Sequence, residues 1–180
     1  STWSAVLEQY GWDAADLNLV DGSLVLVTQV KAGAYNDALD LFQTLADADP
    51  ARLMQGSWVL AGQDALNAVA FAYQQEDDSA KASEILAFRD ERITRLQPLA
   101  SPHFLEPMAL NAALRGDLDE SFTLLSRAVD LGWANYYMAI NDPRWGDTLQ
   151  QSRFAALLER VQENIAEQRA QVTTMLQESL

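Results

Sequence analysis

The sequence predicts an all-α protein made of paired helices, and three observations lead to that prediction. Between Gly116 and Asp130 the apolar residues recur at the spacing of one helix face: Phe122, Leu125, Ala128 and Val129. Glycine turns at Gly33 and Gly116 each follow one helical pattern and precede another. The stretch 151–178 contains no glycine or proline and repeats apolar residues every three or four positions, as a long helix does.

The composition restricts the classes of partner. Of the 180 residues, 49% are hydrophobic, which suffices for a core and argues against intrinsic disorder. Acidic residues outnumber basic ones by 26 to 12, and the net charge is −14. Such a surface repels nucleic acid and anionic lipid, so we expect no direct nucleic-acid binding and a neutral or basic partner. The acidity also has a simpler explanation, which is solubility.

The cysteine content and the length of the apolar runs bear on where in the cell the protein is located. The absence of cysteine excludes disulfides, thiolate metal ligands and cysteine nucleophiles. It fits any compartment and suits the oxidising periplasm slightly better than the cytoplasm. The longest uninterrupted apolar run, 68–73, is too short to span a bilayer, so we expect no transmembrane segment here. The chain begins at Ser1 without a leader, which we interpret as an excised or processed piece of a larger protein.

Capping residues and helix-breaking residues predict the first helices. Residues 2–9 form a short helix that Gly11 ends. The stretch 13–30 is open to two interpretations, because Asp21-Gly22 between apolar pairs is also typical of a turn joining two strands. The helix, glycine turn and helix that follow over 31–42 favour a helix. Asp49-Pro50 ends this first pair.

Two further pairs follow. In the second, a helix carrying Leu66 and Tyr73 is separated by the polar run 74–79 from a helix that extends to Gln97-Pro98. In the third, a helix from Pro102 to Arg115 precedes Gly116. Asp117 is then placed to cap the next helix.

The stretch from Ala34 to Phe42, ending at Asp49-Pro50, resembles the second helix of a tetratricopeptide repeat, whose period is about 34 residues. Aligned on this pattern, the repeats lie near 19–52, 63–96 and 102–135, with starts 44 (63 − 19) and 39 (102 − 63) residues apart. The resemblance implies a single domain, 1–180, in which helical hairpins form a right-handed superhelix closed by a capping region at 136–180. The small residues where paired helices touch would be Ala38, Ala70, Ala82, Ala109 and Ser121.

The tail carries a second resemblance. Leu131-Gly132-Trp133, the run from Asn141 to Trp145 and the run from Ser152 to Leu158 are similar to the tails of degenerate tetratricopeptide regions. Such regions are fused behind bacterial transmembrane winged-helix regulators and nucleotide cyclases. The resemblance implies the sensory or interaction part of a larger bacterial signalling protein.

The long C-terminal helix carries a heptad-like seam: Leu158, Val161, Ile165, Gln168, Val172 and Met175. Its first part is expected to pack on the last repeat as a cap. Two arrangements are open for the remainder. Either it lies along its own domain, or it pairs with a second copy and forms a homodimer through Val161, Ile165, Val172 and Met175.

No arrangement of residues typical of catalysis is apparent. His103 is the only histidine and stands at a helix start, where a capping or surface role suffices. The acidic runs 76–78 and 117–120 lack the pattern of a calcium loop. Phosphate loops, dinucleotide fingerprints and nucleophile elbows are absent from the sequence. We therefore predict no enzymatic activity, no cofactor and no metal.

The predicted function is non-catalytic binding of a protein or peptide in a groove formed by the first helix of each pair. The resemblance to tetratricopeptide repeats implies these groove residues: Lys31, Asp64, Asn67, Phe71, Gln74, Gln75, His103 and Glu106. Two alternatives remain. One is an assembly module that dimerises through the C-terminal helix. The other is a small-molecule sensor with a site among the five tryptophans, Trp3, Trp12, Trp58, Trp133 and Trp145.

Overall fold

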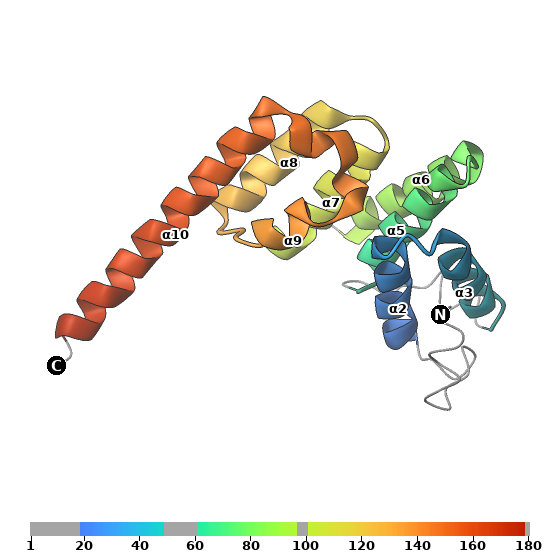
Figure 1. Ribbon diagram of the computed structural model, residues 1–180, viewed down its shortest axis with the longest axis horizontal. Helices are drawn as coiled ribbons and strands as arrows, with labels where there is room; N and C mark the ends of the chain where they lie inside the picture. Colours follow the sequence, from blue (N-terminus) through green and yellow to red (C-terminus); the bar gives the residue numbers. More distant parts are fainter. Residues whose placement is uncertain (1–18, 49–60, 97–100, 179–180) are drawn as a thin grey trace. The chain divides into compact units, whose positions relative to one another are not determined.

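The computed structural model describes residues 19–48, 61–96 and 101–178, shown as ribbon in Figure 1. Within these ranges every regular element is helical and there is no strand, so the all-α prediction is confirmed for this part of the chain. The elements are α2 (Leu19–Lys31), α3 (Tyr35–Ala48), α5 (Ala61–Gln75), α6 (Ser79–Leu96), α7 (Pro102–Leu114), α8 (Leu118–Asp130), α9 (Tyr136–Ile140), the 3-10 helix η2 (Pro143–Gln150) and α10 (Ser152–Glu178). The helix expected at 2–9 and the breaks expected at Asp49-Pro50 and Gln97-Pro98 lie outside the described residues.

The helical interpretation of 13–30 is confirmed from Leu19 onward, because Asp21-Gly22 lies inside α2 and makes no turn. At Gly22 it is the absence of a side chain that matters, and not turn formation. A Cβ atom built on Gly22 would lie 2.7 Å from Cδ1 of Leu45 on α3. A side chain at this position would force the buried Leu45 side chain to move, so the glycine leaves room for Leu45 between α2 and α3.

The same tight turn joins the two helices of three successive hairpins, α2–α3, α5–α6 and α7–α8. Each turn has one residue in the left-handed region: Gly33 (φ 76°), Asp77 (φ 60°) and Gly116 (φ 83°). The next residue then donates its amide over 2.9 Å to the carbonyl five residues earlier: Ala34 to Gln29, Asp78 to Tyr73 and Asp117 to Ala112. This is a Schellman end, which satisfies the last carbonyls of a helix. The turns are 44 (77 − 33) and 39 (116 − 77) residues apart, the separations that the sequence alignment predicted.

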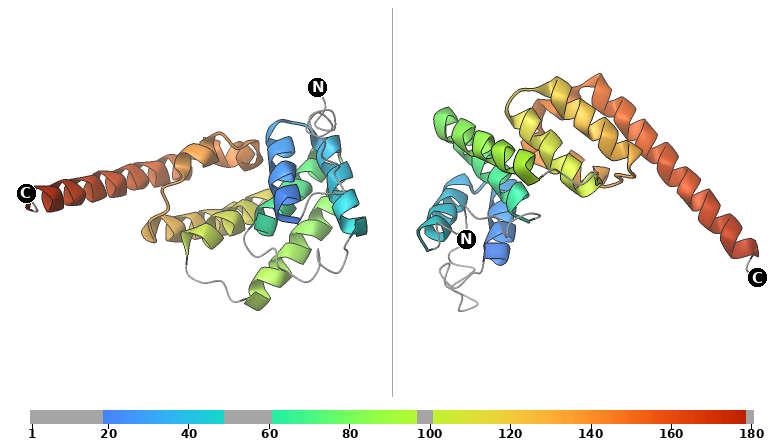
Figure 2. Two further views of the ribbon diagram at one scale, coloured as in Figure 1. Left: turned by 90° about the horizontal axis from the view of Figure 1, so that it is seen from below. Right: turned by 180° about the vertical axis from the view of Figure 1, so that it is seen from behind.

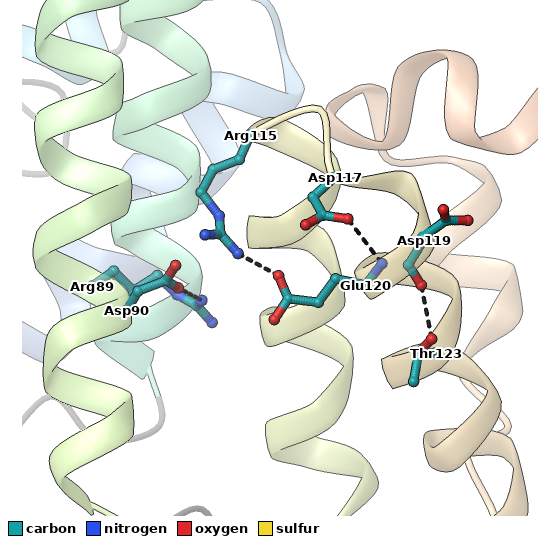
Figure 3. Close-up of polar contacts among 7 residues, drawn as sticks. All are labelled: Arg89, Asp90, Arg115, Asp117, Asp119, Glu120 and Thr123. Atoms are coloured by element: carbon teal, nitrogen blue, oxygen red, sulfur yellow. Dashed lines mark hydrogen bonds and ion pairs between the residues drawn. The ribbon is translucent and has the colours of Figure 1, made fainter.

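In two of the hairpins the second helix also begins in the same way. Asp78 Oδ1 accepts the amide of Lys81 at 3.0 Å. Asp117 Oδ1 likewise accepts the amide of Glu120 at 3.0 Å, as Figure 3 shows, which confirms the cap predicted from the sequence. Four residues after each cap position a small side chain is completely or almost completely buried: Ala38, Ala82 and Ser121.

The first hairpin has the turn but no cap, because Ala34 stands where the others have aspartate. Ala34→Asn is therefore expected to stabilise the protein by about 0.5–1 kcal/mol and to raise Tm by a few degrees, without adding charge. Thermal unfolding followed by circular dichroism measures this. Ala34→Gln is the matched control, since its longer amide does not reach the orphan amides in the geometry of a cap. An equal gain from both variants would show that capping is not the cause.

In the first compact unit, residues 1–97, α2 packs against α3 and α5, and α5 also packs against α3 and α6. Leu26, Val30, Leu41 and Leu45 of the first hairpin are buried, and so is every residue of α5 from Ala65 to Ala72. The rings of Tyr35 and Phe71 meet edge to face at 5.9 Å and 74°. Each helix hides its apolar side on a neighbour, which a single amphipathic helix cannot do alone.

In the second unit, residues 98–180, α7 and α8 form the hairpin, α10 packs on α8, and η2 packs on α7, α9 and α10 (Figure 2). One apolar cluster fills the space between them and includes Leu105, Phe122, Leu125, Val129, Trp133, Trp145, Phe154, Leu157 and Val161. The prediction that the beginning of the C-terminal helix covers the third hairpin is confirmed by these contacts.

Candidate interaction surfaces

The groove residues predicted on the first unit have different environments. Gln75 is exposed, and Lys31, Asp64 and Gln74 are half-buried. Asn67 and Phe71 are buried, at 0% and 9% exposure, so the expectation that they line an open groove is not met. The ring of Phe71 meets that of Tyr35 on α3.

Glu106, a groove residue predicted on the second unit, already has a structural partner. The indole Nε1 of the buried Trp133 donates to Glu106 Oε2 at 2.7 Å. This bond satisfies the single donor of the indole. The side chain of His103 lies outside the described set. Trp133 and Trp145 are both core residues, and the other three tryptophans lie outside the described ranges, so the tryptophan site stays a prediction.

Polar contacts attach the first half of α10 to α8. Arg153 donates to Asp119 Oδ1 at 2.5 Å, and its guanidinium lies 4.5 Å from the centre of the Phe122 ring. Seven residues further on, about two helical turns, Arg160 donates to Ser126 Oγ at 2.9 Å and also pairs with Asp130, the last residue of α8. The later residue on α10 contacts the later residue on α8, so the two helices run in the same direction.

Beyond these contacts α10 continues past the end of α8 (Figure 1). Every residue from 166 to 177 is exposed. Among them Val172, Met175 and Leu176 are between 55% and 66% exposed. Of the four residues predicted for a dimer seam, Val161 is completely buried and Ile165 is half-buried against the core of its own unit. The predicted seam is therefore corrected: its first half is packed within its own unit, and only Val172 and Met175 have exposed side chains.

An apolar surface that the sequence analysis missed lies on α9. This one-turn helix exposes Tyr137 (68%), Met138 (51%) and Ile140 (41%), whereas Ala139 is buried beneath them. The available signal was the apolar run from Tyr136 to Ile140 directly after a turn. Its short length prevents periodicity from distinguishing a buried segment from an exposed one.

A buried ion pair supports α9 from the C-terminal side. Arg144 Nε donates to Asp142 Oδ1 at 2.9 Å, and Arg144 Nη2 donates to Oδ2 at 2.6 Å. Both residues are at most 5% exposed. The amide of Asp142 also donates to the carbonyl of Ala139 at 3.1 Å, which closes the end of α9. This bidentate pair restricts the orientation in which α9 displays its apolar side chains.

Comparison with known proteins adds no family: no protein-family model, curated protein or solved structure matches the chain. Over the described residues, no three histidine, cysteine, aspartate or glutamate side chains converge as metal ligands would. None of the helices within 19–48, 61–96 and 101–178 combines the length and apolarity that crossing a bilayer requires.

Proposed function

We propose that this chain is a non-catalytic protein-binding module made of tetratricopeptide-like helical hairpins. Three features support the repeat: the shared left-handed turn, the cap position after it, and the buried small residue four positions later. In the first unit, α5 touches both helices of the preceding hairpin, as side-by-side hairpins of a repeat array do.

The observation that carries the binding function is the exposed apolar side of α9. Tyrosine, methionine and isoleucine in water lose hydrophobic stabilisation that a partner would restore. Tyrosine and methionine are also enriched at protein interfaces. The Asp142–Arg144 pair holds α9 in place beforehand, so docking costs little ordering entropy. Because the whole chain carries a net charge of −14, a neutral or basic partner fits best.

The place of this module in a larger bacterial signalling or regulatory protein is proposed from the resemblance of its tail alone. One of the runs that carry this resemblance, from Asn141 to Trp145, directly follows α9 and contains the Asp142–Arg144 pair. The proposed docking surface and the resembling tail are thus one region of the second unit.

Replacing two apolar side chains of α9 tests the proposal. We expect the double variant Tyr137→Ser/Met138→Ser to lose at least tenfold in affinity for the native partner, because exposed apolar anchors dominate such interfaces. Its Tm should stay within about 2 °C of the wild type, since surface substitutions change stability by less than about 0.5 kcal/mol. Partners are identified by proximity labelling in the native host and affinities are then measured with the purified pair.

The matched control is Leu24→Ser on α2, which removes a side chain that is 60% exposed but far in sequence from α9. It should leave the affinity unchanged. A partner that binds the α9 variant as tightly as the wild type would refute the proposed surface.

A further inference from the structure

Helix α9 is too short to maintain its conformation alone. It spans only the five residues Tyr136–Ile140, and a helix of about one turn is unstable in water unless tertiary contacts fix it. Within α9 only Ala139 is buried, and Tyr136 is half-buried. Much of the support for α9 must therefore come from the residues on either side of it.

Buried polar contacts lie on both sides of α9. After the helix comes the Asp142–Arg144 pair. Before it comes Trp133, which is 4% exposed and whose indole Nε1 donates to Glu106 Oε2 at 2.7 Å. Glu106 lies on α7 and precedes Trp133 by 27 residues. This bond thus ties the chain just before α9 to a helix that packs in the core of the same unit.

We propose that Glu106 is a positioning residue for the α9 surface. Acting through Trp133, it keeps the chain before α9 in the place from which α9 displays its apolar side chains. The inference rests on the proposed function of that surface. It assigns Glu106 a role different from the groove contact that the sequence predicted, because its carboxylate supports the surface and does not need to touch the partner.

The physical reason is the single donor of the indole. A hydrogen bond to a carboxylate is stronger than one between neutral groups, whereas a buried donor that loses its acceptor is unfavourable. Without Glu106 the chain can relieve this by moving the indole of Trp133 into water, which also removes support from α9. Such an opening would be local, because α8 packs on both α7 and α10 through other residues.

Hydrogen exchange of the 180-residue chain, followed by NMR, tests the proposal. The amides of Met138 and Asp142 report on α9, since they donate to the carbonyls of Asn135 and Ala139. We expect Glu106→Leu to accelerate exchange of these amides at least tenfold, while amides in the middle of α8 stay within about threefold of the wild type. Unchanged exchange in α9 would overturn the proposal. Equal acceleration in α8 would also overturn it, since Glu106 would then stabilise the whole unit.

A conservative variant separates the hydrogen bond from the charge. Glu106→Gln keeps an oxygen acceptor at the end of a side chain of the same length, so exchange in α9 should stay within about threefold of the wild type. If Glu106→Gln accelerates exchange as much as Glu106→Leu does, the negative charge and not the hydrogen bond is responsible, and the proposed role is wrong.

A double variant tests whether Glu106 acts through Trp133. Trp133→Phe removes the donor and Glu106→Leu removes the acceptor, so either substitution breaks the same bond. Their effects on exchange in α9 should therefore not multiply when the two are combined. Multiplied effects would show that the two residues act independently and would overturn the proposal.

The indole proton of Trp133 provides a spectroscopic signature. Its NMR resonance is identified by its loss in Trp133→Phe, and hydrogen bonding to the carboxylate shifts it downfield. We expect it to move upfield in Glu106→Leu, and an unchanged position would show that Glu106 is not the acceptor. None of these measurements requires a partner. If exchange behaves as expected but the α9 serine variant binds like the wild type, the positioning role stands and the proposed binding surface is wrong.

Discussion

Replacing Arg144 with methionine is expected to remove about 3–5 kcal/mol from the free energy of unfolding of the second unit. The substitution leaves the carboxylate of Asp142 at 5% exposure without the guanidinium that donates to both its oxygens. A domain is stabilised by only about 5–15 kcal/mol in total, so this loss approaches unfolding at ordinary temperature. Urea unfolding followed by circular dichroism, with hydrogen exchange over residues 101–165, measures the effect and locates it.

The control for Arg144 is an exposed pair in the same unit. Arg115 and Glu120 pair at 2.6 Å across the turn before α8, with side chains 35% and 47% exposed (Figure 3). Because water screens this pair, Arg115→Met should cost less than about 1 kcal/mol. The double variant Asp142→Leu/Arg144→Met should recover part of the loss, since it removes the uncompensated charge. Equal losses from Arg144→Met and Arg115→Met would show that burial of the pair does not contribute.

The second large effect is expected from Ala38→Asp in the first hairpin. Ala38 is completely buried one turn into α3, at the position that Ala82 and Ser121 occupy in the other hairpins. An aspartate there would bury a charge and force apart the helices that meet at this position, at a cost above about 3 kcal/mol. We expect the first unit to lose hydrogen-exchange protection and to become sensitive to proteolysis.

A neighbouring substitution separates burial from charge. Asn36→Asp introduces the same carboxylate on an exposed position in the first turn of α3, where a negative charge is favourable. It should leave stability unchanged or slightly raised. If Ala38→Asp is tolerated as well as Asn36→Asp, the equivalence of the three hairpins is wrong at this position.

Local signals in the sequence predicted the helices well. The periodicity of Phe122, Leu125 and Val129 depends only on one helix and its buried side, and α8 has the predicted cap at Asp117. Gly33 and Gly116 predicted two turns, because glycine adopts the left-handed backbone region at little cost in free energy. The third turn lacked that signal. Asp77 adopts φ 60° in place of glycine, so what reads as a polar run of six residues is one tight turn.

Exposure of individual side chains was harder to predict. Asn67 and Phe71 lie on the helix face expected to be open, and Val161 lies in a seam that suggested a second copy. Their burial depends on which helix lies opposite, and that helix is distant in the sequence. The Asp142–Arg144 pair was hidden for a related reason: residues two apart with opposite charges usually lie in water, and only the surrounding core removes the water here.

By itself the sequence determined that the described chain is helical, where the paired helices begin and turn, and that its surface is strongly acidic, because these properties depend on residues within a turn or two of one another. Tertiary structure decided which faces are covered. Contacts between segments 30 or more residues apart, such as Arg153 with Asp119 and Arg160 with Asp130, determine which part of α10 is covered and which part is exposed. Whether an apolar side chain is buried depends on its neighbour as much as on its own chemistry, so the exposed apolar side chains on α9 and at the end of α10 become apparent only in the fold.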